Sequence, residues 1–209
     1  MKKLIIIILS VVLAKTTIAQ LVIRNAIISN PVFFDNFNQG YTTGNIGGQR
    51  HWTDIQNNLA VSGGAVSGAT SGADICACRS ETFSANQYSQ IIVTSIEDHG
   101  YIGVAVRCSA GINYYGYYAT DDGRYFFKYV SGVLTQIAHA TAITTNIGDV
   151  LRIEVQGSTI RCYLNSVLDT SLPGGTGIFT DTSITTGAVG ICASRNYAMG
   201  GDNWSGGNL

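Results

Sequence analysis

The chain has 209 residues, of which 45% are hydrophobic and only 12% are charged, against roughly 25% charged residues in an average soluble protein. Its 12 basic and 13 acidic residues give a net charge of −1, which argues against a nucleic acid partner because phosphate binding needs clustered cations. The length suits one domain, particularly an all-β one, and a surface so poor in charge is either adhesive or covered.

Residues 1–19 have the parts of a secretory signal peptide. Lys2 and Lys3 precede an apolar run over residues 4–14, and small residues follow where a signal peptidase cleaves. The apolar run is well short of the roughly 20 residues that a membrane-spanning helix needs. We therefore expect a cleaved leader, a mature chain that begins at Gln20 without a membrane span, and a secreted or cell-surface protein.

An apolar arm, residues 20–34, follows the predicted leader. Strand alternation would place apolar side chains on both of its faces, so both faces require burial. Asn30-Pro31 ends the predicted strand. The arm either folds back as the first strand of its own domain or adds to the sheet of a neighbouring copy. In the second case the assembly residues are Leu21, Val22, Ile23, Ala26, Ile27 and Ile28.

The rest of the chain predicts about twelve short strands, because runs of β-branched and aromatic residues alternate with turn residues. Gly63-Gly64 is a two-residue hairpin turn between strands 59–62 and 65–67. No helical periodicity follows the leader, so two packed antiparallel sheets are expected. The other expected strands are 90–96, 101–108, 113–119, 124–130, 133–138, 149–155, 159–164, 167–168, 187–192 and 202–204.

Four stretches carry a resemblance to a known fold family. They are Asp35-Asn36-Phe37, Trp52, GDVLRIEVQGSTIRCYLNSVL at 148–168 and GDNWSGG at 201–207. Together they resemble the concanavalin A-like, laminin-G-like jelly roll of exported bacterial proteins. The resemblance implies an all-β, antiparallel two-sheet jelly-roll sandwich over residues 35–209. Folds of this kind host lectins, glycosidases, adhesins and structural subunits alike.

The resemblance leaves a structural calcium ion open, since laminin-G-like domains often hold one at a loop rim. Asp121, Asp122 and Asp202 nevertheless form no recognisable calcium-binding pattern. The three histidines lie far apart in the sequence without metal-ligand spacing. We therefore predict no metal-ligating residues and no cofactor.

No catalytic pattern stands out. The enzymes of this fold family place three acids on one strand as E-x-D-x-x-E, because hydrolysis needs a proton donor and a second carboxylate close by. That pattern does not occur here. Glu97-Asp98 is interpreted as a turn, and Glu154 has Arg152 and Gln156 as its same-face neighbours. The sequence therefore predicts no catalytic residues and no enzyme.

The five cysteines are odd in number, so at least one is free or bonded outside the chain. Cys76 and Cys78 are two residues apart and so share one face of a strand. One interpretation is buried thiols that pack as small apolar residues. The other is a covalent link between neighbouring copies.

An aromatic hairpin, residues 113–130, is the strongest binding signal. Alternation separates Tyr115 and Tyr117 from Tyr114 and Tyr118, and it places charged residues between the aromatic ones of the second strand. Exposed rings stack on sugars, whereas buried rings stabilise a sheet by cross-strand packing, and both interpretations stay open. The glycan-binding candidates are Tyr115, Tyr117, Tyr125 and Phe127.

These features together predict a non-enzymatic extracellular structural or adhesive subunit. It would associate with copies of itself, possibly into a fibre, through strand donation by the arm, because a donated arm makes a head-to-tail contact that propagates. The alternative is a secreted lectin-like module that binds extracellular glycan. A glycoside hydrolase is the third interpretation.

Overall fold

The computed structural model describes residues 30–38, 44–56, 59–68, 75–98, 100–194 and 199–209. Within these ranges all regular elements are β-strands, and none is a helix that could span a membrane. The strands are β1 (Val32–Asp35), β2 (Gly44–Asn45), β3 (Trp52–Gln56), β4 (Leu59–Ser62), β5 (Ala65–Gly68), β6 (Ile75–Arg79), β7 (Gln87–Ser95), β8 (Ile102–Ser109), β9 (Asn113–Ala119), β10 (Gly123–Val130), β11 (Val133–Thr141), β12 (Val150–Gln156), β13 (Thr159–Leu164), β14 (Val167–Leu168), β15 (Ile178–Thr180), β16 (Ala188–Ala193) and β17 (Gly200–Asn208).

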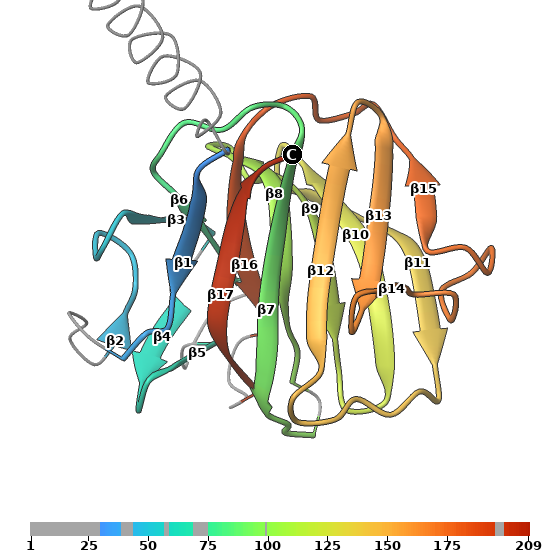
Figure 1. Ribbon diagram of the computed structural model, residues 1–209, viewed down its shortest axis with the longest axis horizontal. Helices are drawn as coiled ribbons and strands as arrows, with labels where there is room; N and C mark the ends of the chain where they lie inside the picture. The colour runs from blue at the N-terminus through green and yellow to red at the C-terminus, as the bar shows by residue number, and fades with distance from the viewer. Residues whose placement is uncertain (1–29, 39–43, 57–58, 69–74, 99, 195–198) are drawn as a thin grey trace, which may run out of the picture. The chain divides into compact units, whose positions relative to one another are not determined.

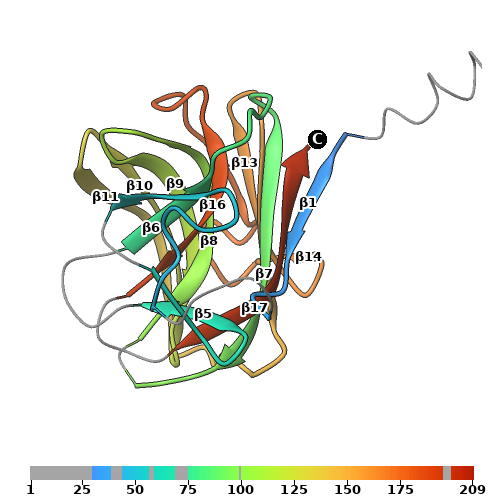
Figure 2. The ribbon, with the colours of Figure 1, turned by 90° about the vertical axis from the view of Figure 1, so that its left-hand side faces the viewer.

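The strands form two stacked antiparallel sheets (Figures 1 and 2). The ten-stranded sheet has the order β14-β13-β12-β7-β17-β5-β4-β2, with β1 beside β17 and β15 beside β13. The seven-stranded sheet has the order β11-β10-β9-β8-β16-β6-β3. Neighbours along the sequence often lie in different sheets, so most of the core is built from contacts between distant segments. The expected all-β jelly-roll sandwich is confirmed.

Local sequence signals placed several hairpins correctly. Gly63 and Gly64 have φ angles of 60° and 81°, which glycine adopts without steric cost, and they join β4 to β5 as expected. The hairpins β9–β10 and β12–β13 also form where alternation predicts them. Strand β3 was missed, because a short run with mixed polarity gives a weak periodic signal. Strand β6 was expected only through the strand face that Cys76 and Cys78 share.

The last residues of the predicted arm belong to the sandwich. Val32 pairs with Gly207 and Asp35 with Trp204, so β1 is an edge strand beside β17 of the same chain. One compact unit runs from Val32 to Leu209. The six predicted assembly residues between 21 and 28, and the predicted leader, lie outside the described residues.

The main core fills the space between the two sheets and centres on two tryptophans. Trp52 and Trp204 are fully buried and meet edge to face, with ring centroids 4.9 Å apart. A buried indole needs an acceptor for its N–H. Trp52 Nε1 donates to Asp35 Oδ2 at 3.0 Å, and Trp204 Nε1 donates to Ser89 Oγ at 2.8 Å. These contacts fix β3 and β17 relative to β1 and β7.

A buried arginine lies against the same rings. The guanidinium of Arg79 lies 5.2 Å from the ring of Trp52 and 5.7 Å from that of Trp204. Its charge is balanced by Glu81 at 2.6 Å and by Asp35 at 3.7 Å, as a buried charge requires. The sequence stretches at 35–37, 52 and 201–207 that carry the family resemblance therefore meet in one cluster, because each supplies part of it.

A second, smaller apolar cluster covers the opposite face of the seven-stranded sheet. Gly116 makes it possible, because a Cβ at this position would come 2.3 Å from the ring of Phe127. The cluster contains Cys76, Cys78, Ala105, Cys108, Tyr114, Phe127, Tyr129 and Cys192. All five cysteines of the chain are buried and unbridged, as the interpretation of buried thiols predicts, and Cys162 lies apart from the others in the main core.

Candidate functional site

The two faces of the β9–β10 hairpin divide the predicted glycan-binding residues. Tyr115 and Tyr117 face the main core and are 0% exposed. Phe127 faces the opposite side but is only 2% exposed, within the second cluster. Tyr125 alone of the four is partly exposed and lines a cavity. The four rings therefore do not form one surface, because strand alternation sends two of them to each face.

The core-facing tyrosine hydroxyls have partners inside the protein. Tyr117 donates to Asp169 Oδ2 at 2.7 Å, and Arg124 Nε donates to the same oxygen at 2.9 Å. Burial, followed by the negative charge of Asp169, raises the pKa of Tyr117 well above its ordinary value. Arg124, a polar side chain that could have served an exposed ring, is thus committed to a buried ion pair.

Tyr115 belongs to a similar network at the end of the hairpin remote from its turn. Its hydroxyl donates to Asp181 Oδ1 at 2.6 Å and accepts from the Ile184 N–H at 3.0 Å. Lys128 Nζ donates to Asp181 Oδ2 at 2.6 Å. Burial and the hydrogen bond to Asp181 raise the pKa of Tyr115 to about 12. The network anchors the loop 181–184 to the sheet.

Four aromatic rings form a stacked row on the outer face of the seven-stranded sheet. Ring centroids are 4.0 Å apart from Tyr101 to Tyr118, 4.7 Å from Tyr118 to Tyr125 and 3.7 Å from Tyr125 to His139. The rings are nearly parallel, with interplanar angles of 24°, 15° and 19°. Tyr118, Tyr125 and His139 are cross-strand partners on β9, β10 and β11, and Tyr101 directly precedes β8. The register of the sheet therefore builds most of this aromatic column.

The stacking has a chemical consequence for ligand binding. Tyr118 has a neighbouring ring on each of its two faces, and so has Tyr125. A sugar that stacks on an aromatic side chain needs an open ring face. Both faces of each inner ring of the aromatic column are covered by a neighbouring ring, so the ring stacking that the sequence suggested has no open face at Tyr118 or Tyr125.

Beside the aromatic column lies a cavity of about 500 Å³. We call it the acidic cavity, because three carboxylates line it together with tyrosines. Its lining residues are Asp98, Tyr101, Tyr118, Thr120, Asp121, Asp122 and Tyr125. Its volume falls within the range of about 300–1,000 Å³ that is usual for small-ligand sites.

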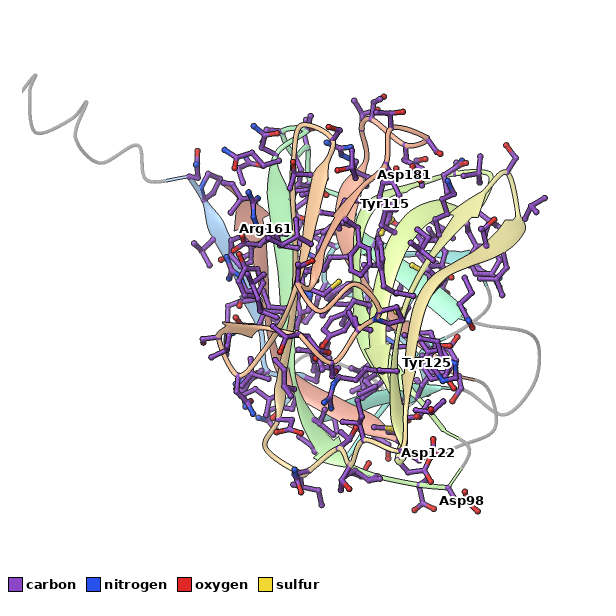
Figure 3. All side chains as sticks on the ribbon, turned by 90° about the vertical axis from the view of Figure 1, so that its right-hand side faces the viewer. Asp98, Tyr115, Asp122, Tyr125, Arg161 and Asp181 are labelled. Atoms are coloured by element: carbon purple, nitrogen blue, oxygen red, sulfur yellow. The ribbon has the colours of Figure 1, made fainter. Side chains whose placement is uncertain are left out.

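Two loops from one end of the sandwich bring the carboxylates together. Asp98 follows β7, and Asp121-Asp122 form the β9–β10 turn, so Asp98 and Asp122 lie near each other below Tyr125 in Figure 3. The turn is closed by a 2.8 Å hydrogen bond from Thr120 N–H to the Gly123 carbonyl. Thr120 Oγ1 also donates to Asp122 Oδ1 at 3.1 Å. These bonds hold the turn in one conformation.

Two of the carboxylates in the acidic cavity, Asp121 and Asp122, are not balanced by a cation of the described part of the chain. No other described residue forms an ion pair with Asp121 or Asp122. Burial, and then the charges of Asp122 and Asp121, raise the pKa of the Tyr125 hydroxyl, which therefore stays a hydrogen-bond donor at neutral pH. The site thus combines hydroxyl groups that both donate and accept with carboxylates that only accept.

The acids considered in the sequence analysis separate in space. Glu154 lies on the ten-stranded sheet, where it accepts from Arg152 at 2.8 Å and from the Tyr163 hydroxyl at 3.1 Å. It is therefore a structural side chain. Asp98 and Asp121-Asp122, which resembled ordinary turn residues, line the cavity instead. Only the fold could have found this site, because its acids stand more than twenty residues apart in the sequence.

The sequence predicted no metal ligands, and the carboxylates of the acidic cavity are the residues on which this prediction bears. Among the described residues, no group of three or more His, Cys, Asp or Glu side chains is arranged to hold a metal ion. The carboxylates of the acidic cavity do not form such a group. A structural calcium ion stays an untested expectation.

A smaller cavity of about 280 Å³ lies at the opposite edge of the sandwich. Its walls include Arg50, His51 and Arg79, but the charge of Arg79 is already balanced by Asp35 and Glu81. The guanidinium of Arg79 is therefore held by carboxylates of the same chain.

No family model matches the chain, and no curated protein matches its sequence. Solved structures share its fold. The carbohydrate-binding module CBM66 from Bacillus subtilis superimposes with a TM-score of 0.55 at 20% identity, over 76% of this chain and 92% of that one. A lichenase, a β-1,3-1,4-glucanase from a mouse hindgut metagenome, gives 0.56 at 6% identity, over 85% and 98%. The Crh5 transglycosylase gives 0.58 at 8% identity, over 85% and 84%.

The chain thus has the concanavalin A-like jelly-roll fold that the resemblance implied. The same structures correct the predicted function. A self-associating structural subunit was expected, but the neighbours are a carbohydrate-binding module, a glucanase and a transglycosylase, which favour the lectin-like alternative. The prediction that the chain is not an enzyme is also wrong as it was argued, because a missing sequence pattern does not exclude activity in a fold that includes enzymes.

Proposed function

We propose that the protein binds neutral glycans in the acidic cavity. The observation that carries the proposal is the meeting of three carboxylates with the edges of stacked tyrosines in one cavity. Sugar hydroxyls donate well to carboxylates, and hydrogen bonds to a charged acceptor are roughly twice as strong as neutral ones. The tyrosine hydroxyls can donate to the same sugar, since each hydroxyl is both donor and acceptor.

The charge of the cavity selects among glycans. Like charges that are brought together at short range repel, and a partly enclosed site screens this repulsion less than open solvent does. Glycans that carry uronic acid or sulfate groups should therefore bind worse than uncharged chains of the same length. The similarity to a carbohydrate-binding module supports glycan binding at the level of the fold only.

The experiment is a glycan array followed by calorimetric titration of the best ligand. We expect binding to at least one neutral oligosaccharide, with affinity reduced about fivefold in Tyr125→Phe, since one hydrogen bond contributes about 1 kcal/mol. Tyr163→Phe is the matched control, because it removes a hydroxyl from the ten-stranded sheet. Absence of binding to every neutral glycan, or equal loss in both variants, would refute the proposal.

A second candidate is glycoside hydrolysis or transfer in the same cavity. It is favoured by the presence of carboxylates from two loops, since such reactions require two carboxyl groups on opposite sides of the bond. Released reducing sugar from the array's best ligand would measure it. Activity that disappears in Asp98→Asn and in Asp122→Asn, while binding persists, would establish this function; binding with no turnover would leave the module function alone.

We also propose that the protein acts outside the cell, where polysaccharides are accessible. The predicted leader at residues 1–19 supports this location. Mass spectrometry of protein recovered from the medium of the native host tests it. A chain that begins at Gln20 is the expected product, whereas a cell-associated chain that retains Met1 would contradict it.

A further inference from the structure

Four of the five cysteines gather on one face of the seven-stranded sheet. Cys192 lies on β16, Cys76 and Cys78 lie on the adjacent strand β6, and Cys108 lies on β8 at the other side of β16. All four belong to the second apolar cluster, and we call them the thiol cluster. Three neighbouring strands thus supply the sulfur atoms, and the pairing register decides which of them can bond.

Cys76 and Cys192 are direct partners across the antiparallel pair of β6 and β16. Residues in such positions have Cα atoms about 4.5 or 5.5 Å apart and side chains on the same face. A disulfide requires a Cα separation of about 4.4–6.8 Å. Both kinds of antiparallel pair meet this requirement. The Cβ atoms of directly opposite residues are about 4.5–5.5 Å apart, close to the upper limit of about 4.5 Å in disulfides, so the bridge needs only a small approach of the two strands. The sulfur of Cys192, which lies 3.6 Å from the Val104 carbonyl, would also have to rotate towards Cys76.

Pairs that involve Cys78 fail the same test. Cys76 and Cys78 project in parallel from one strand, about 6.6 Å apart, whereas bonded cysteines have Cβ atoms about 3.5–4.5 Å apart. Cys78 faces Gly190, which places it diagonally from Cys192 at about 7–8 Å. Neither pair can be bridged without movement of the backbone.

Pairs that involve Cys108 have Cα atoms too far apart for a bridge, although the Cys76 thiol reaches Cys108 with a hydrogen bond. Strand β16 lies between β8 and β6, so the Cα atom of Cys108 is about 9–10 Å from those of the β6 cysteines. Along β16, Cys108 pairs with Ala188, four residues from Cys192 and hence about 13 Å from it. The sulfur of Cys108 fills the space over Gly190 instead, 3.1 Å from where a Cβ would stand.

We propose that Cys76 and Cys192 form a disulfide when the chain folds in an oxidising environment. The other three cysteines stay as thiols, which accounts for the odd number. The inference is independent of the glycan site, and it assigns one bridge among ten conceivable cysteine pairs by register alone. The bridge would link β6 to β16 and close a long loop of the chain.

The reaction is thiol–disulfide exchange with a disulfide oxidant such as oxidised glutathione. The thiolate of one cysteine attacks the oxidant, forms a mixed disulfide and releases one glutathione thiolate. The thiolate of the second cysteine then attacks the protein sulfur of the mixed disulfide and releases the second glutathione. The two protons lost by the cysteines are taken up by the two released glutathiones, and the protein is oxidised by two electrons.

Burial of the two thiols determines when during folding the bridge can form. Both thiols are 0% exposed in the folded protein, and burial, followed by the hydrogen bond that Cys76 donates to Cys108, raises the pKa of Cys76 well above its ordinary value. Burial likewise raises the pKa of Cys78 to about 12. Since only a thiolate attacks a disulfide, the folded dithiol reacts slowly. The bridge therefore forms during folding, before the cluster is covered.

The test is refolding of the reduced, unfolded chain in a glutathione redox buffer. After alkylation of free thiols, mass spectrometry of peptides from the unreduced protein should find one bridge, between Cys76 and Cys192, and three alkylated cysteines. The oxidised protein should melt about 5–15 °C above the reduced one, because the bridge restricts the unfolded chain. Reduction with dithiothreitol under unfolding conditions should remove the difference.

Variants separate the proposed pair from its neighbours. Cys192→Ala and Cys76→Ala should each leave four alkylated thiols, no bridge and no difference in melting temperature between redox conditions. Cys78→Ala and Cys162→Ala are matched controls that should retain the bridge. The peptide map of the wild-type protein tests the proposal even if a variant fails to fold. Five alkylated cysteines in the refolded wild type, or a bridge to Cys78, Cys108 or Cys162, would overturn the proposal.

Discussion

The two ends of the β9–β10 hairpin both place tyrosine beside aspartate, but they differ in charge balance (Figure 3). At the neutralised end, Asp181 accepts hydrogen bonds from Tyr115 and Lys128. At the acidic end, Asp121 and Asp122 lie beside Tyr125 without an ion pair to any described residue. A carboxylate whose cation is supplied by its own chain stabilises the fold, whereas one without it stays available to a ligand.

The difference also appears in proton affinity. Burial by itself would raise the pKa of Asp181, but hydrogen bonds from Lys128, Tyr115 and Ser183 outweigh burial and hold its pKa well below the ordinary value. At the acidic end the negative charges act on a neighbour, and together with burial they raise the pKa of Tyr125. The contacts of Asp181 at the neutralised end thus contribute to the stability of the fold. At the acidic end, Asp121 and Asp122 keep a negative charge that no described residue balances by an ion pair.

The largest effect is expected from Asp181→Ala at the neutralised end. The change leaves Lys128 and Tyr115 without their shared acceptor in a site that is less than one fifth exposed. Loss of one partner of a largely buried pair should cost about 2–4 kcal/mol of unfolding free energy. Urea unfolding measures it, with Asp122→Ala as the control that should change stability by less than about 0.5 kcal/mol. Equal losses of unfolding free energy in the two variants would show that the two ends of the hairpin do not differ in their contribution to stability.

The next effect is on ligand affinity at the acidic end. Asp121→Asn with Asp122→Asn should weaken binding of a neutral glycan about 10- to 100-fold, because hydrogen bonds to charged acceptors contribute about 1.5–3 kcal/mol. The same double variant should bind uronic acid-containing chains better than the wild type does. Calorimetric titration compares the two ligand classes. An unchanged preference between them would show that charge does not select the ligand.

Acid sensitivity should distinguish the neutralised end. A depressed pKa in the folded state contributes stability above the unfolded-state pKa of about 3.9, and this contribution is lost as the pH falls below it towards the folded-state pKa. The stability difference between the wild type and Asp181→Ala should therefore be constant near neutral pH and shrink below about pH 4. Urea unfolding at a series of pH values measures it. A difference that grows with acidity would contradict the assigned direction.

The smallest effect concerns the titration of Tyr125. Its raised pKa should fall in the Asp121→Asn, Asp122→Asn double variant, because the nearby negative charges disfavour the phenolate. The difference in ultraviolet absorbance between each protein and its Tyr125→Phe derivative isolates this one tyrosine. A titration that the acids leave unchanged would assign the shift to burial alone.

Local pattern was sufficient to predict much of the fold. Alternation identified the hairpins β9–β10 and β12–β13, because one face of each strand must be apolar for the sheets to pack. Gly63-Gly64 located a turn through its positive φ angles. Three of the four stretches that carry the resemblance, at 35–37, 52 and 201–207, supply residues that surround the buried guanidinium of Arg79, which the sequence did not reveal.

The tertiary structure determined which residues come together in the candidate site. Periodicity correctly separated Tyr115 and Tyr117 from their neighbours but could not say which face of the hairpin met the second sheet, since both faces are aromatic. The sequence could not predict that rings of three strands stack in register with Tyr101, or that Asp98 and the β9–β10 turn line one cavity. Both follow from the order of strands in the sheets. Strand identity is a local property of the chain, whereas the distance between two carboxylates, or between two cysteines, depends on pairings that form only when the whole sandwich folds.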